Sequence, residues 1–210
     1  MLSKLRPHIK LIQYFLSWPF IKLKISPNLI SISGLFFALI GAYFVYQQNF
    51  LLAFLFFLIA PTMDLIDGTV ARALNKVSNW GNYFETMIDK FVDFIMIGSF
   101  VFIPGLEIPS ILALGFSMLS SYAKPRVALI IIADNHDWPA IGEHADKLII
   151  VFIGLLLAFF GYNYLNFALY LIALISLIGT IQRIIYAKKL IKTAEKKGTL
   201  LPYIKNKKER

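Results

Sequence analysis

The sequence predicts an all-α polytopic membrane protein, in which six transmembrane helices follow an amphipathic helix at the membrane interface. Of its 210 residues, 58% are hydrophobic and only 16% are charged, whereas a soluble globular protein is about 45–50% apolar and about 25% charged. Its uncharged stretches are long enough to cross a bilayer, and its basic residues all fall on one side of the resulting topology. These properties exclude a disordered chain, a water-soluble domain and a nucleic-acid-binding protein.

Two uncharged stretches, residues 25–63 and 148–182, contain most of the predicted spans. A transmembrane helix needs roughly 20 apolar residues, so the first stretch holds one full span and most of a second. Turns at 47–49 and 161–163 divide the two stretches, and Pro104-Gly105 closes the third span. The predicted spans cover residues 29–46, 50–74, 82–103, 108–132 and two segments of 148–182.

The distribution of basic residues predicts how these helices are oriented. Lys and Arg occur before the first span, in the connections between spans two and three and between spans four and five, and after the sixth. The opposite turns, near Gln47, Pro104 and Tyr162, contain none, so all 21 basic residues lie on one side. The positive-inside rule makes that side cytoplasmic. We therefore expect both termini in the cytoplasm, with the net charge of +9 at the membrane surface.

We expect three parts along the chain. Residues 1–24 form an amphipathic juxtamembrane helix, because apolar residues recur there at helical spacing with Lys and Arg between them. Residues 25–187 form the six-helix membrane domain, and residues 188–210 form a basic cytoplasmic tail that is attracted to membrane lipids. Cysteine is absent, which excludes disulfides, zinc–thiolate sites and a thiol nucleophile.

The second and third predicted spans contain five of the twelve acidic residues. Asp64 and Asp67 share one helix face, and Glu85, Asp89 and Asp93 share another. A carboxylate at membrane depth costs about 2.5–3.5 kcal/mol, and like charges brought together raise one another's pKa unless a cation lies between them. If the two faces meet, a divalent cation accounts for the cluster, and oxygen ligands favour magnesium, manganese or calcium over zinc or copper.

The spacing alone leaves three further roles open for the acidic residues. The acids can pair with Arg72, Lys76 and Lys90 and tie two helices together, or they can line a proton or cation pathway. An intramembrane magnesium-dependent prenyltransferase also uses paired aspartates. That class usually has a further Asp four residues after the second one, where this chain has Ala71, and more helices.

A family resemblance rests on the segment Asp64-Leu-Ile-Asp67-Gly68-Thr-Val-Ala71-Arg72 and the residues that follow it. Eight residues separate this segment from Gly81, and Glu85 and Asp89 then follow at intervals of four. This pattern resembles the signature of the CDP-alcohol phosphatidyltransferases, D-x2-D-G-x2-A-R-x8-G-x3-D-x3-D. Seven of the eight fixed positions match at the required spacing. The departure is Glu85, where the family has Asp, and its extra methylene moves the carboxylate by about one carbon–carbon bond.

The resemblance implies an activity and a site. Members of this family transfer a phosphoalcohol group from a CDP-alcohol, such as CDP-diacylglycerol or CDP-archaeol, to a second alcohol with release of CMP. It implies a homodimer and a site that faces the cytoplasm, with Asp89 as the base that deprotonates the attacking hydroxyl. Two ions, Mg²⁺ or Mn²⁺, would be held by Asp64, Asp67, Glu85 and Asp89. The CDP-linked lipid would contact Asp64, Asp67, Gly68, Ala71, Arg72 and Gly81.

A second, weaker resemblance concerns the acceptor alcohol. The segments 121–126 and 142–147 are similar to the basic pocket of members that use phosphorylated acceptors such as inositol phosphate. Lys124, Arg126 and Lys147 would then clamp the acceptor phosphate. The alternative is that the three are ordinary positive-inside residues, and the sequence leaves both roles open.

Overall fold

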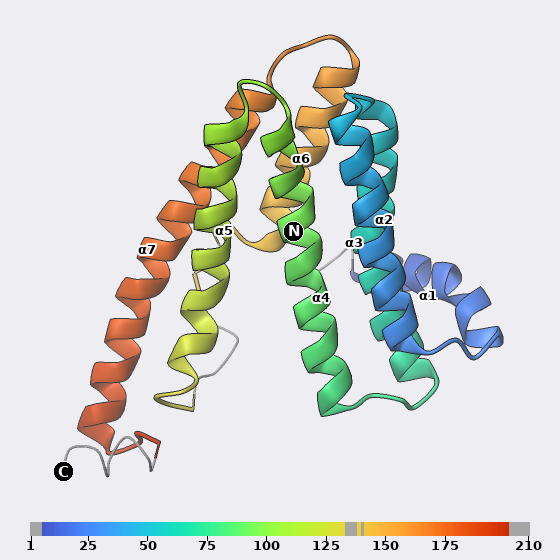
Figure 1. Ribbon diagram of the computed structural model, residues 1–210. Helices are drawn as coiled ribbons and strands as arrows, with labels where there is room; N and C mark the ends of the chain where they lie inside the picture. Colours follow the sequence, from blue (N-terminus) through green and yellow to red (C-terminus); the bar gives the residue numbers. More distant parts are fainter. Residues whose placement is uncertain (1–5, 133–137, 140, 202–210) are drawn as a thin grey trace. The chain divides into compact units, whose positions relative to one another are not determined.

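The structure is a computed structural model that describes residues 6–132, 138–139 and 141–201 (Figure 1). Over these residues the protein is all-helical, as predicted, and its one β-type pairing is an isolated antiparallel bridge between Ile131 and Leu200. The elements are α1 (Arg6–Lys22), α2 (Pro27–Tyr46), α3 (Phe50–Ala73), α4 (Asn79–Gly98), the 3₁₀-helix η2 (Ser99–Phe102), α5 (Glu107–Val127), α6 (His144–Phe159) and α7 (Leu165–Lys197).

The chain divides into two compact units. The first comprises the described residues up to Ile103 together with Leu155–Tyr162, and it contains α1 to α4. The second comprises the described residues of Pro104–Gly154 and those from Asn163 onward, and it contains α5, most of α6 and α7. The acidic residues of α3 and α4 belong to the first unit.

The helices of the first unit begin and end close to the predicted positions. Pro27 occupies the first turn of α2, where its missing N–H costs nothing. Asn49 caps α3 by accepting a hydrogen bond from the Leu52 N–H at 3.2 Å. The Ser78 hydroxyl caps α4, which therefore starts three residues before the predicted span at 82–103. The predictions for residues 1–5 lie outside the described residues.

Two helices of the second unit differ in length from the predicted spans. The fourth span was expected at 108–132, but α5 ends at Val127. Pro125 lies in its last turn and removes one backbone donor, and the chain then turns so that Leu201 N donates to Ile130 O at 3.0 Å. The last helix runs fifteen residues past Gln182 to Lys197, and ends at Gly198 with φ +66°. Part of the predicted tail 188–210 is therefore helical, and residues 202–210 lie outside the described residues.

Small residues let α2 and α3 pack with their backbones close together. A Cβ atom built on Gly34 would lie 2.9 Å from the Ala60 carbonyl oxygen, and one on Gly41 would lie 2.3 Å from the Phe57 ring. These glycines share the buried face of α2 with Ser31. The close approach brings the first half of α2 within reach of the acidic part of α3.

The second unit also contains a close approach between segments. A Cβ atom on Gly179 of α7 would lie 2.2 Å from the Ile141 carbonyl oxygen, so the loop before α6 packs directly on this helix. The hydroxyls of Ser117 and Ser176 join α5 to α7 at 3.2 Å. Hydrogen bonds between hydroxyls and close backbone packing are typical of helices that associate in lipid.

Three of the described helices, α2, α3 and α7, are long and apolar enough to cross a membrane by length and composition. α4 carries Glu85, Asp89, Lys90 and Asp93 among its 20 residues, and α6 has only 16 residues. Six membrane crossings therefore stay a prediction.

Candidate active site

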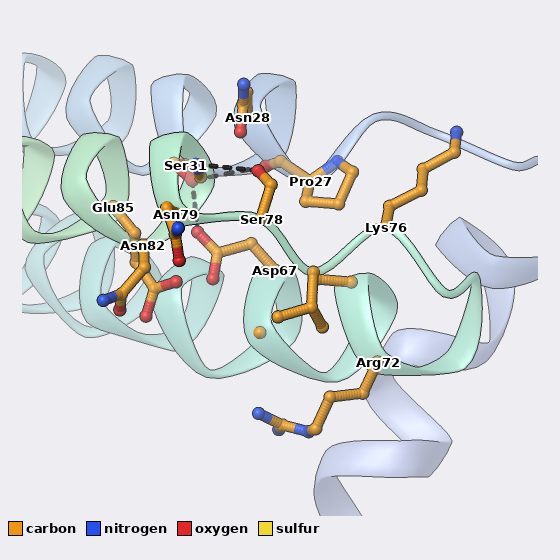
Figure 2. Close-up of a pocket in the computed structure, with 14 residues that line it drawn as sticks. Pro27, Asn28, Ser31, Asp67, Arg72, Lys76, Ser78, Asn79, Asn82 and Glu85 are labelled. Atoms are coloured by element: carbon orange, nitrogen blue, oxygen red, sulfur yellow. Dashed lines mark hydrogen bonds between the residues drawn. The ribbon is translucent and has the colours of Figure 1, made fainter.

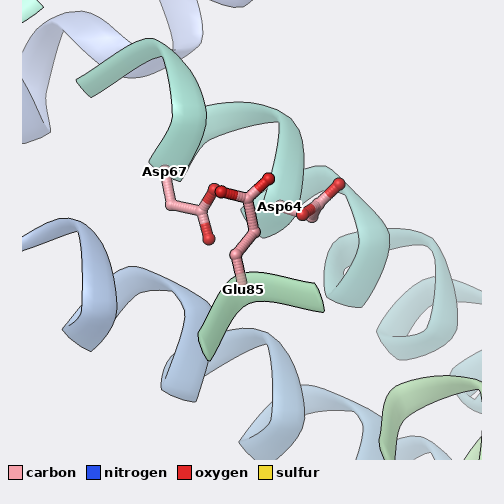
Figure 3. A group of neighbouring side chains, drawn as sticks. All are labelled: Asp64, Asp67 and Glu85. Atoms are coloured by element: carbon pink, nitrogen blue, oxygen red, sulfur yellow. The ribbon is translucent and has the colours of Figure 1, made fainter. Parts of the chain in front are cut away.

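Three carboxylates from two helices of the first unit come together. Asp64 and Asp67 lie one turn apart on α3, and Glu85 reaches them from α4 (Figure 3). One oxygen of each carboxylate lies within 4.8 Å of one oxygen of the other two. Asp67 is buried, whereas Asp64 and Glu85 are half-buried. Carboxylates at this separation can share one hard cation.

One oxygen of the Asp67 carboxylate accepts a hydrogen bond, whereas the other has no hydrogen-bond partner in the described part of the chain. The Ser31 hydroxyl of α2 donates a hydrogen bond to Asp67 Oδ2 (Figure 2). Asp67 Oδ1 is buried and has no hydrogen-bond partner among the described residues. A buried carboxylate oxygen without a donor is costly, and a divalent cation would satisfy it. The residues present therefore fit a metal site.

The other two acids of α4 have different surroundings. Asp89 lies one turn beyond Glu85, is half-buried, and lies close to Asp64. Asp93 is 2% exposed and forms an ion pair with Lys90 within the same helix, at 3.5 Å. Of the five acids, Asp93 thus pairs with a lysine of its own helix, and this ion pair does not tie α4 to another helix.

A cavity of about 410 Å³ opens beside the buried carboxylate (Figure 2). It is formed by the start of α2, the end of α3 and the start of α4, and all of its lining belongs to the first unit. Of the six residues predicted to contact the CDP-linked lipid, all except Asp64 line it, and so does the predicted metal ligand Glu85. The remaining lining residues are Pro27, Asn28, Ser31, Lys76, Val77, Ser78, Asn79 and Asn82.

The cavity is suited to an anion next to a cation. The first turn of α4 lines it, and the Ser78 hydroxyl accepts the Gly81 N–H at 3.0 Å. The remaining N–H groups of a helix N-terminus attract phosphate. The guanidinium of Arg72 lies over Gly68, where a Cβ atom would be 3.4 Å from Nη1. It also donates to Thr69 Oγ1 at 3.3 Å. A diphosphate would meet positive charge on two sides.

Sequence reasoning missed the contribution of α2 and of the amides around the cavity. Ser31 and Asn28 come from α2, and Asn79 and Asn82 come from the first turn of α4. The available signal was a pair of polar residues, Asn28 and Ser31, three apart at the start of a mostly apolar helix. Which face of α3 they meet depends on packing that the spacing does not reveal.

The predicted acceptor residues lie in the second unit. Lys124 and Arg126 are in the last turn of α5, and Lys147 is in the first turn of α6. Lys124 Nζ lies 5.9 Å from the centroid of the Trp138 ring, whereas Lys147 is 2% exposed and Arg126 is exposed. Their binding of one phosphate stays a prediction.

Known proteins resemble this chain along most of its length. The profile of the CDP-alcohol phosphatidyltransferase family matches residues 24–179. The archaetidylinositol phosphate synthase of Pyrococcus horikoshii is 33% identical over 195 residues, which cover 90% of this chain and 97% of that protein. The phosphatidylinositol phosphate synthase of Streptomyces avermitilis is 26% identical over 79% of this chain and 73% of its own length.

Crystal structures of the Mycobacterium tuberculosis phosphatidylinositol phosphate synthase share the fold. The form with CDP-DAG bound has a TM-score of 0.73 at 20% identity and covers 84% of this chain and 93% of that chain. The complex with manganese and citrate also has a TM-score of 0.73 at 20% identity, over 83% of this chain and 88% of that chain.

Helices apolar enough to cross a membrane, and acids of α3 and α4 that converge beside a polar cavity, fit the class of membrane-bound transferases to which the family match points. The chain belongs to the CDP-alcohol phosphatidyltransferase family. It is an enzyme of phospholipid synthesis that transfers a phosphoalcohol group from a CDP-alcohol to a second alcohol. This assignment supports the transferase over the prenyltransferase and the cation or proton carrier.

Proposed function

We propose that this enzyme transfers the phospholipid group of a CDP-linked lipid to the hydroxyl of an inositol phosphate and releases CMP. The observation that carries the proposal is the convergence of Asp64, Asp67 and Glu85 within 4.8 Å, beside the cavity that Gly68, Arg72 and Gly81 line. The two relatives named above are synthases of inositol phosphate lipids, which supports the choice of acceptor.

The cavity of the first unit receives the CDP moiety. Gly68 and Ala71 leave the surface of α3 low enough for the nucleotide to approach the backbone, and Arg72 offers its guanidinium to a phosphate oxygen. The N-terminus of α4 at Gly81 faces the same space and favours negative charge. Asp64 and Asp67 would hold the cations that neutralise the diphosphate.

Asp64, Asp67, Glu85 and Asp89 hold two divalent ions, Mg²⁺ or Mn²⁺. When bound, such ions neutralise the charge that develops on the phosphate oxygens and on the departing CMP. The manganese complex of the Mycobacterium tuberculosis protein supports this choice of metal, as do the all-oxygen donors and the unsatisfied Oδ1 of Asp67 in this chain.

Asp89 acts as the base of the transfer. Its carboxylate takes the proton from the acceptor hydroxyl, and the hydroxyl oxygen attacks the phosphorus that carries the lipid alcohol. The bond from this phosphorus to the bridging oxygen breaks, and that oxygen leaves on CMP. A well-placed carboxylate accelerates such a step by roughly 10²–10⁴. Asp89 suits the role because it is half-buried and next to Asp64.

The second unit supplies the acceptor site. Lys124, Arg126 and Lys147 bind the phosphate of the inositol phosphate through their positive charges.

We extend the proposal to the membrane arrangement. Residues 25–187 cross the bilayer six times, both termini and the active site face the cytoplasm, and the amphipathic segment 1–24 and the tail 188–210 lie at the lipid surface. The one-sided distribution of Lys and Arg supports the topology. Exposed Tyr14, Phe15 and Trp18 of α1 support contact with headgroups. The enzyme acts as a homodimer, by resemblance to its family.

The test is CMP release by the purified full chain in lipid nanodiscs. CDP-archaeol and CDP-diacylglycerol are each supplied with inositol 1-phosphate, with Mn²⁺, Mg²⁺ or EDTA, and the lipid product is identified by mass spectrometry. We expect a lipid-linked inositol phosphate that depends on the metal, and its loss in Asp89→Asn. Glu107→Gln, which changes an exposed acid of the second unit whose Oε2 accepts the Gly105 N–H, serves as the matched control. Metal-dependent CMP release with glycerol phosphate or free inositol, but not with inositol phosphate, would reject the acceptor.

A further inference from the structure

Ser31 is a polar residue near the start of the buried face of α2. It is 5% exposed, and the rest of this face consists of Ile30, Gly34, Ala38 and residues beyond them. No part of the family signature includes it. Its hydroxyl nevertheless reaches across to α3 and donates to Asp67 Oδ2.

A short side chain makes this contact because the two helix backbones are close. Gly34, one turn after Ser31, would place a Cβ atom only 2.9 Å from the Ala60 carbonyl oxygen and 3.2 Å from Met63 Cβ. At such a separation a serine hydroxyl spans the gap between the helices. Gly34 thus allows the backbones of α2 and α3 to lie close together, and this closeness lets Ser31 reach Asp67.

The hydrogen bond gives the two carboxylate oxygens of Asp67 different surroundings. Oδ2 accepts from Ser31, whereas Oδ1 is buried without a hydrogen-bond partner among the described residues. Carboxylates that bind metals are commonly held by a hydrogen bond to the oxygen or orientation that the metal does not use. The donor also limits rotation of the carboxylate, which lowers the entropy lost on binding.

We propose that Ser31 is a positioning residue for the metal site: it fixes the Asp67 carboxylate so that Oδ1 is presented to the cation beside Asp64 and Glu85. The inference rests on the proposed function, because it takes Asp67 as a metal ligand. It adds a residue of α2, outside the acidic motif, to the determinants of cation affinity.

A purely structural role is the alternative, and the same helix offers a comparison. Ser31 Oγ also lies 3.2 Å from the Pro27 carbonyl oxygen, a contact within its own helix. Ser33 makes only that type of contact, since its hydroxyl donates to Ile30 O at 2.6 Å. A hydroxyl has a single hydrogen, so Ser31 cannot donate it to Asp67 Oδ2 and to the Pro27 carbonyl oxygen at the same time. A purely structural role would direct this hydrogen to Pro27.

The experiment titrates Mn²⁺ into the purified full chain in detergent, by isothermal titration calorimetry and by the electron paramagnetic resonance signal of the free ion. Four proteins are compared: the unchanged chain, Ser31→Ala, Ser31→Thr and the control Ser33→Ala. Circular dichroism and gel filtration check that each variant is folded. We expect Ser31→Ala to weaken Mn²⁺ binding by at least about tenfold, Ser31→Thr to retain the affinity, and Ser33→Ala to leave it unchanged.

The outcomes separate this inference from the proposed function. Equal Mn²⁺ affinity of the unchanged chain and a folded Ser31→Ala overturns the role of Ser31 and leaves the metal site intact. Equal weakening by Ser31→Ala and Ser33→Ala also overturns it, because a general effect on α2 would then account for the loss. An unchanged chain that shows no saturable Mn²⁺ binding overturns the metal site itself, and this inference with it.

Discussion

The guanidinium of Arg183 donates to both the backbone carbonyl and the hydroxyl of Ser120, and so ties α7 to the carboxyl-terminal part of α5. The Nη1 atom lies 3.1 Å from the Ser120 carbonyl oxygen, and its contact with the hydroxyl is closer still. Arg183 is 7% exposed, and Glu143 and Asp146 of the adjoining segment attract its charge. One residue therefore organises the part of the second unit that contains the proposed acceptor residues.

Arg183→Met is expected to destabilise the protein. The change removes a charged donor from the Ser120 carbonyl oxygen, and a hydrogen bond to a charged group contributes about 1.5–3 kcal/mol. The free energy of unfolding in mixed micelles of increasing SDS fraction measures the effect. Lys188→Met, at an exposed site of the same helix, is the control and should change it by less than about 0.5 kcal/mol. Equal stability of the two variants would contradict the role of Arg183.

Gly68→Ala is expected to weaken binding of the CDP-linked lipid without weakening the fold. A Cβ atom there meets only the Arg72 guanidinium, at 3.4 Å, so the helix accepts it, but it enters the cavity where the nucleotide is proposed to lie. We expect KM for the CDP-lipid to rise at least tenfold, with the unfolding temperature unchanged or higher, since alanine favours a helix over glycine by about 1 kcal/mol.

Gly115→Ala is the matched control for this prediction. Gly115 is also a helical glycine, lies in α5, and has nothing within 4 Å of an added Cβ atom. It should gain the same helical stability and keep KM for the CDP-lipid. A Gly68→Ala enzyme with the KM of the unchanged chain would argue that the nucleotide does not approach α3 at this position.

Glu85→Asp is expected to weaken metal binding even though it introduces the residue usual in the family. In this chain the longer side chain brings the carboxylate within 4.8 Å of Asp64 and Asp67, and shortening it withdraws the oxygens by about 1.5 Å. We expect Mn²⁺ affinity to fall severalfold in calorimetry, and further in Glu85→Gln, which loses the charge. Tighter binding by Glu85→Asp would show that α4 adjusts to the shorter ligand.

The acidic cluster could be predicted from the sequence, whereas its support by α2 could not. Spacing within α3 and within α4 is local, so it places Asp64 with Asp67, and Glu85 with Asp89, on common faces. The polar turn at 47–49 similarly predicted the end of α2 and the start of α3. These predictions depend on residues close together in the chain.

Spacing within one helix does not predict contacts between segments that lie far apart in the sequence. Ser31 lies 36 positions from Asp67, and Arg183 lies 63 from Ser120. Arg183 follows the last uncharged stretch, so its position in the sequence predicts that it lies with the basic residues on the cytoplasmic side. In the structure, however, its side chain is buried. Its burial depends on close packing around Gly179, which no periodicity reveals. Small residues at helix interfaces decided these contacts.

The absence of cysteine allows a direct test of the proposed topology. Single cysteines replace Gln47, in a turn predicted to be outside, and Val77 and Lys188, on the side predicted to be cytoplasmic. All three side chains are exposed, so a membrane-impermeant maleimide reaches any of them that shares its compartment. In intact cells of the expression host we expect Gln47→Cys alone to be labelled, and the other two only after permeabilisation, because all 21 basic residues lie on their side. Labelling of Val77→Cys in intact cells at the rate of Gln47→Cys would place the cavity on the outer face and reject the cytoplasmic site. If Lys188→Cys is labelled in intact cells but Val77→Cys is not, the two residues lie on opposite sides of the membrane. That result would reject an even number of spans between the cavity and the end of α7.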